Sequence, residues 1–81
     1  MELIKQEDIA SVSLFDLRLS EGELMVYESC IEYVLNNCNE NDLYDLTGCE
    51  NREELTTYQI DLKNLIKSLV NKNYLLEKYK E

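Results

Sequence analysis

The side chains of this sequence that could do chemistry are carboxylates and thiols, because the chain contains no histidine. Adjacent acids stand at Glu7-Asp8 and Glu53-Glu54. A carboxylate pair performs acid–base catalysis only inside a cleft that separates the two pKa values. The dipole of a helix favours acids in its first turn, which is where Glu53 and Glu54 are expected. We therefore interpret the acid pairs as solvated or capping groups.

The three cysteines, Cys30, Cys38 and Cys49, do not suit a metal site or a disulfide framework. Their number is odd, no two of them form a C-x-x-C pair, and no histidine completes a mixed zinc site. A catalytic thiolate needs a base such as histidine. The chain has only two glycines, so glycine-rich phosphate motifs are absent too. The sequence predicts reduced thiols in the cytoplasm, no cofactor, no metal and no enzymatic activity.

Charge divides the chain into an acidic body and a basic tail. The net charge is −9; residues 1–56 carry fourteen acids against three bases, whereas residues 57–81 carry five lysines against three acids. An acidic surface repels the phosphates of DNA and of anionic lipids and attracts basic proteins. The chain also lacks a signal-peptide pattern and any run of about 18 apolar residues. We expect a cytoplasmic protein that binds no membrane and prefers protein to DNA as its partner.

The elements that must position these groups are expected to be mainly helical, because a chain with no proline and two glycines has few residues for the many tight turns of an all-β fold. Residues 1–81 are expected to form a single domain. Three helices are expected, at residues 21–36, 42–47 and 52–70. Ser20 and Glu23 form a capping-box pattern before the first helix, Gly48 ends the second, and Asn51 caps the third. Short flanking strands are expected at residues 10–19, where polar and apolar residues partly alternate, and at residues 74–81.

Apolar spacing assigns the inward faces of the two long helices. On the first helix, the expected face comprises Leu24, Tyr27, Ile31, Val34 and Leu35. On the third helix, the expected seam comprises Leu55, Tyr58, Leu62, Leu65 and Leu69, broadened by Ile66 and Val70. Both faces are expected to lie on one modest core, because a chain of this length buries little more.

A second apolar strip, formed by Val26, Cys30 and Tyr33, follows the back of the first helix. Two arrangements account for it. The segment at residues 12–19 can cover the strip and close one core, which is the arrangement we favour. Alternatively, the strip is a self-association seam between two copies in a homodimer.

The order of the helices and the passage that follows them, Leu69-Val70-Asn71-Lys72-Asn73-Tyr74-Leu75, resembles the winged helix-turn-helix superfamily. The resemblance covers about residues 20–80 and implies that the third helix is the recognition helix. Its outward residues would be Thr56, Gln59, Ile60, Lys63 and Lys67, followed by a wing bearing Lys78 and Lys80. Glu53 and Glu54 depart from the family pattern, because they would lie near DNA phosphates. A plain three-helix bundle is the alternative fold.

Two functions are compatible with these patterns. The first is a small acidic regulator or inhibitor that binds a basic, often nucleic-acid-binding, surface of another protein. In size, charge and composition the chain resembles inhibitors encoded by phages and mobile elements, such as anti-CRISPR proteins, which act in the cytoplasm of the host cell. The second, implied by the winged-helix resemblance, is a DNA-binding transcriptional regulator with lysines on phosphates and Thr56 or Gln59 at base edges. The outward face of the third helix is the predicted partner site.

Overall fold

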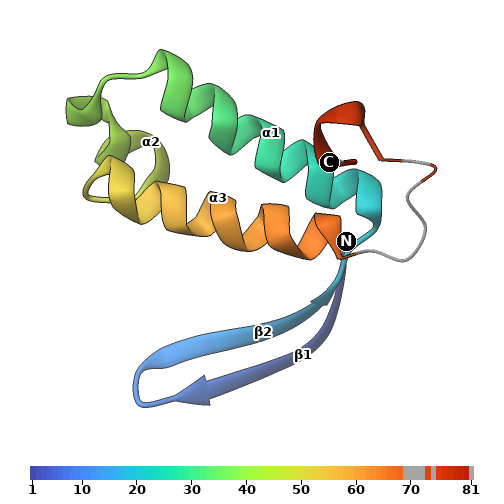
Figure 1. The fold of residues 1–81 in the computed structure, drawn as a ribbon. Coiled ribbons are helices and arrows are strands. Elements are labelled where there is room, and N and C mark those ends of the chain that lie inside the picture. The colour runs from blue at the N-terminus through green and yellow to red at the C-terminus, as the bar shows by residue number, and fades with distance from the viewer. Residues whose placement is uncertain (69–72, 74, 81) are drawn as a thin grey trace.

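The computed structural model describes residues 1–68, 73 and 75–80 and shows a β-hairpin that leads into a helical body (Figure 1). The hairpin consists of β1 (Glu2–Ile9) and β2 (Val12–Arg18), and the body consists of α1 (Glu21–Asn37), α2 (Leu43–Thr47) and α3 (Arg52–Lys67). Two short 3-10 helices are η1 (Glu40–Asp42), before α2, and η2 (Glu77–Tyr79), near the C-terminus. The predicted class, mainly helical with flanking strand structure, is confirmed.

The predicted helix signals act as expected. The backbone N–H of Glu23 donates to Ser20 Oγ at 3.1 Å, and the backbone N–H of Ser20 donates to the Glu23 side chain at 3.2 Å. Gly48 ends α2 with a left-handed φ of 79°, and Asn51 Oδ1 accepts from the backbone N–H of Glu54 at 2.9 Å. The bounds shift slightly: α1 extends to residue 37, α2 begins at 43, and α3 ends at 67. Residues 69–70 of the predicted third helix lie outside the described residues.

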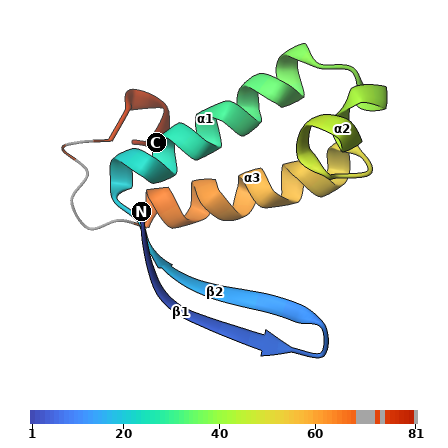
Figure 2. The ribbon, with the colours of Figure 1, turned by 180° about the vertical axis from the view of Figure 1, so that it is seen from behind.

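The helices α1 and α3 lie side by side along most of their length (Figures 1 and 2). A buried apolar cluster lies toward each end of this pair. One cluster comprises Leu24, Ile66, Leu75 and Tyr79, and the other comprises Leu35, Leu43, Cys49 and Leu55. The core is thus smaller and more divided than the single core that the sequence predicts.

The inward faces of the two long helices are predicted only in part. On α1, Leu24 and Leu35 are buried, but the fully buried residue of the middle turns is Glu28, and Tyr27 is exposed. On α3, Leu55 and Ile66 are buried, whereas the predicted seam residues Tyr58 and Leu65 are about half exposed, at 55% and 49%. The inward face of α3 is therefore rotated toward Gln59, which faces Glu28 of α1. Leu69 and Val70, the last predicted seam residues, lie outside the described residues.

The strand predicted at residues 10–19 is confirmed as β2, but its partner β1 was not predicted. Residues Ala10 and Ser11 join the strands with φ of 49° and 71°, the left-handed values of a tight type I′ hairpin turn. The hairpin projects away from the helices (Figures 1 and 2), and every residue of both strands is exposed. The prediction that residues 12–19 cover Val26, Cys30 and Tyr33 is wrong.

The strand predicted at residues 74–81 is wrong for residues 75–80, which contain η2 instead. The physical reason is that Leu75 and Tyr79 are buried against α1 and α3. Among the described residues, no strand follows α3, so the C-terminal wing implied by the winged-helix resemblance is not observed there. Most of the passage that carried the resemblance, residues 69–72 and 74, lies outside the described residues.

Candidate functional site

One carboxylate of α1, that of Glu28, is fully buried. Tyr79 Oη donates to its Oε1 at 2.5 Å, Gln59 Nε2 donates to its Oε2 at 3.0 Å, and Lys78 Nζ lies 3.5 Å from Oε1. Burial raises the pKa of Glu28, but the hydrogen bonds from Tyr79 and Gln59 and the charge of Lys78 outweigh burial and hold the pKa below its usual value. Both oxygens have donors, so the network fastens the C-terminal segment to the helices.

The lowered pKa of Glu28 predicts that this group makes the protein less stable in acid. The folded state binds the proton of Glu28 more weakly than the unfolded state, whose Glu pKa is about 4.3. The stabilising contribution is therefore present above that value and is lost as the pH falls through the lower pKa of the folded state. Urea unfolding between neutral and acidic pH, with Glu28→Gln as the reference, measures it. We expect the stability advantage of the wild type over Glu28→Gln to shrink in acid; an advantage that stays constant would contradict the assignment.

The predicted partner face of α3 is not uniformly outward. Ile60 is 50% exposed, as predicted, and Thr56, Lys63 and Lys67 are partly buried. The prediction that Gln59 faces outward is wrong, because its amide turns inward to Glu28. This face therefore offers one exposed apolar side chain beside Thr56 and two lysines, and of the two side chains expected to read base edges it lacks Gln59.

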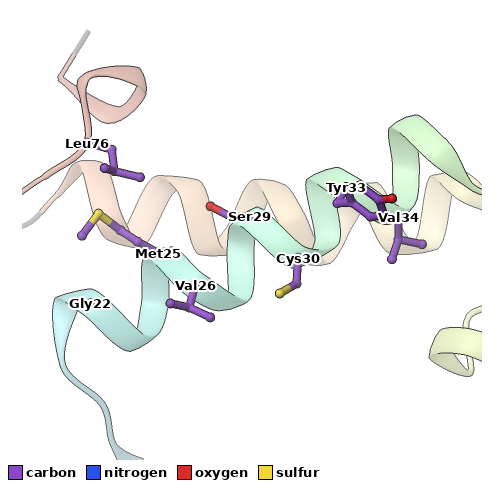
Figure 3. Close-up of a pocket in the computed structure, with 8 residues that line it drawn as sticks. All are labelled: Gly22, Met25, Val26, Ser29, Cys30, Tyr33, Val34 and Leu76. Carbon is purple, nitrogen blue, oxygen red and sulfur yellow. The ribbon is translucent and has the colours of Figure 1, made fainter.

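The strip of Val26, Cys30 and Tyr33 is exposed and lines an apolar groove of about 630 Å³ on the outer side of α1 (Figure 3). In Figure 3, Leu76 of the C-terminal segment lies across from Met25 at one end of the groove. The other lining residues are Gly22, Ser29 and Val34. No charged side chain is among these lining residues, although the chain carries a net charge of −9. We call this surface the apolar groove.

The end of the body that contains α2 and the start of α3 is rich in carboxylates, and we call it the acidic end. Its six exposed acids are Glu40, Asp42, Asp45, Glu50, Glu53 and Glu54. Within the described part of the chain, none of the six forms an ion pair with a lysine or arginine. The one base nearby, Arg52, donates from its guanidinium to the backbone carbonyl of Leu35. The acidic end is therefore an uncompensated negative surface.

A second groove, of about 600 Å³, adjoins the acidic end, and we call it the acidic groove. Apolar side chains from α1 and α3, including Ile31, Tyr58 and Leu62, line it together with the carboxyl-bearing residues Glu54 and Asp61. An arginine or lysine side chain has the matching chemistry, because its alkyl stem packs on apolar surface while its charge seeks a carboxylate or the face of an aromatic ring.

The remaining candidates for chemistry are dispersed. Cys30 is exposed, Cys38 is partly buried and Cys49 is buried, and all three are free thiols. Within the described residues, no group of three cysteine or acidic side chains is placed to hold a metal ion. Glu54 accepts a hydrogen bond from the backbone N–H of Glu50 at 3.0 Å, whereas the side chain that caps α3 is that of Asn51. No helix in the described ranges is long and apolar enough to cross a bilayer.

Sequence reasoning missed Glu28, Tyr79 and the exposed hairpin. Glu28 lies four residues after Leu24 and so shares its inward face, but a carboxylate in that position is ordinarily read as solvated. Its donors, Gln59 and Tyr79, are distant in sequence, so only the tertiary structure brings them together. Comparison with known proteins adds no relative: the chain matches no protein-family model, no curated protein and no solved structure.

Proposed function

We propose that this protein is a non-enzymatic regulator or inhibitor that docks its acidic end on a basic surface of another protein in the cytoplasm. The observation that carries the proposal is the set of six exposed carboxylates without ion-pair partners in the described residues, next to a groove suited to a basic side chain. A basic protein surface is attracted to this field over roughly 8 Å at physiological salt. A nucleic-acid-binding protein presents such a surface, and the acidic end would compete with its phosphate ligand.

This manner of action is that of the small inhibitors that phages and mobile elements direct against host defence, such as anti-CRISPR proteins, which work in the host-cell cytoplasm. Supporting features are the net charge of −9 and the concentration of unpaired acids at one end of the body. Tyr58, which is half exposed in the acidic groove, is suited to stack against an arginine of the partner.

Charge neutralisation at the acidic end and in the adjoining acidic groove tests the proposal against a control of equal net charge. The test variant is Asp42→Asn, Asp45→Asn, Glu50→Gln and Asp61→Asn combined. The control variant combines Glu2→Gln, Glu7→Gln, Glu21→Gln and Glu77→Gln, all exposed acids elsewhere. At low salt we expect the wild type and the control to recover the same stoichiometric basic protein from a host lysate. We expect the test variant to bind that protein about 30-fold more weakly, since four exposed charge pairs are lost.

Two results would contradict the proposal. One is equal weakening of both variants, which would mean that net charge and not the acidic end drives binding. The other is the absence of any stoichiometric partner at low salt. Added duplex DNA or RNA should displace the wild-type protein from its partner if the two compete for one basic surface.

For the alternative, a winged-helix regulator, we expect no duplex DNA binding. Of the four lysines that this alternative needs, Lys78 pairs with Glu28 and Glu32, and Lys80 pairs with Glu77. Gln59, the predicted base-edge residue, is engaged by Glu28 as well. A fluorescence-anisotropy titration with labelled duplex at about 50 mM salt checks this expectation. Saturable binding that weakens steeply with salt would favour the DNA-binding function over the one proposed here.

A further inference from the structure

The chain exposes more surface than a compact monomer of its mass. Its accessible surface is 6248 Å², whereas a folded monomer of 9.6 kDa exposes about 5,100 Å². Its radius of gyration is 14.5 Å, against about 11.7 Å for a compact domain of 81 residues. The excess area, about 1,100 Å², is larger than the roughly 800 Å² that each partner contributes to a stable interface.

The hairpin contributes to this excess, because every residue of both strands is exposed. One of its faces carries the cross-strand pair Leu3 and Leu17 and, farther along, Phe15, which pairs with Gln6. The other face carries Ile9, Val12 and Leu14 near the turn. All six apolar residues are 44–56% exposed. An isolated two-stranded hairpin is marginally stable in water at best, so this one gains stability if a further surface covers it.

The apolar groove on α1 is a surface that can accept an exposed apolar face such as that of the hairpin. Its lining residues bear no charge, although the chain as a whole carries a net charge of −9. Two copies of a chain with net charge −9 repel each other where their acidic surfaces meet. They can approach closely where both surfaces are apolar. The lining residues of the groove are uncharged, and the Leu3, Phe15 and Leu17 face of the hairpin bears a single charged side chain, Asp8, next to the turn.

The hairpin of a given chain does not fill the groove of the same chain. No hairpin residue is among the lining residues of the groove. The base of the hairpin is held in place, because Leu19 packs on the core, Ser20 caps α1, and the amino group of Met1 lies 2.7 Å from Glu23 Oε2. The hairpin therefore leaves the body in a fixed direction, away from α1 (Figure 2).

We infer that a second copy of this chain covers these surfaces, with the Leu3, Phe15 and Leu17 face of each hairpin lying in the apolar groove of the other copy. The exchange is reciprocal, as a two-fold dimer requires, and each copy contributes one hairpin and one groove. It buries the strip of Val26, Cys30 and Tyr33 that no part of the described chain covers. The acidic ends stay outside the interface and free for a basic partner.

Sedimentation equilibrium of three variants tests the dimer. The wild type should have twice the mass of the 9.6 kDa chain. Phe15→Asp in the hairpin and Val26→Asp in the groove should each give a monomer, because both place a charge in an apolar interface. Ile60→Asp is the matched control and should stay dimeric; the three wild-type side chains are 54%, 58% and 50% exposed, so exposure alone does not distinguish them. Circular dichroism verifies that each variant keeps its helices.

A disulfide between two differently altered chains tests the contact itself and does not depend on the stability of the Asp variants. One chain carries Phe15→Cys, Cys30→Ser and Cys38→Ser, and the other keeps Cys30 and carries Cys38→Ser with an affinity tag. Mild oxidation of the mixture should join residue 15 of one chain to Cys30 of the other, since a disulfide forms only where the two Cα atoms approach within about 7 Å. Ile60→Cys in place of Phe15→Cys should not cross-link.

Three results would overturn the inference. The first is a wild-type monomer at every concentration tested. The second is a dimer that withstands both Phe15→Asp and Val26→Asp. The third is a dimer that loses stability only on Phe15→Asp and forms no disulfide between residues 15 and 30, because the hairpins would then pair with each other and leave the groove empty.

Discussion

Replacing Tyr79 with alanine is expected to lower the free energy of unfolding by about 3–5 kcal/mol, the range for truncation of a buried aromatic side chain. Tyr79 is 1% exposed and packs in the cluster with Leu24, Ile66 and Leu75. The substitution also removes the phenol that donates to the buried carboxylate of Glu28. Small domains have about 5–15 kcal/mol of stability in total, so this single change removes a large part of it.

Tyr79→Phe separates the packing of the ring from the hydrogen bond of the phenol. It keeps the ring but leaves Glu28 one donor short, and we expect a loss of about 1.5–3 kcal/mol, the range for a hydrogen bond to a charged group. Urea unfolding followed by circular dichroism measures both variants. If Tyr79→Phe unfolds like the wild type, then the phenol does not hold the buried carboxylate and the network is not a structural anchor.

Replacing Ile66 with alanine is expected to cost about 2–5 kcal/mol, whereas Leu65→Ala is expected to cost less than about 1 kcal/mol. The two residues are neighbours on α3, and the two substitutions remove the same number of carbon atoms. Ile66 is fully buried against α1 and the C-terminal segment, and Leu65 is 49% exposed. The two substitutions remove the same apolar volume and differ in helix propensity by only about a few tenths of a kcal/mol, so the difference between them reports mainly on burial.

Thermal and urea unfolding of both alanine variants measure this difference. The sequence pattern assigns Leu65 to the inward seam, so the experiment also distinguishes the observed rotation of α3 from the one that the apolar spacing predicts. Equal losses at positions 65 and 66 would contradict the rotation seen in the structure. A larger loss at position 65 would restore the predicted seam.

Local signals in the sequence were sufficient for the helices. The capping box of Ser20 and Glu23, the left-handed Gly48 and the cap at Asn51 each act over three or four residues, so their effect does not depend on the rest of the fold. The charge division between the acidic body and the basic tail is also a property of the sequence alone. This charge by itself favours a basic protein as the partner.

Strand and segment packing were less predictable, because they depend on contacts distant in sequence. The charged residues Lys5, Glu7 and Asp8 interrupt the alternation of polar and apolar residues in β1. The strand forms because it pairs with β2 across a two-residue turn. The local composition of the C-terminal segment predicts a strand, but burial of Tyr79 against Glu28 places η2 there instead.

By itself, the sequence determined the helical class, the start and end signals of the helices, the acidic charge of the body and the presence of a second apolar strip on the first helix. Only the tertiary structure decided which face of α3 is inward, that Glu28 is a buried anchor, and that the hairpin leaves the strip uncovered. The physical reason is the distance along the chain over which each interaction acts. Capping and net charge are set by nearby residues or by a sum, whereas burial is set by side chains that approach from distant parts of the chain.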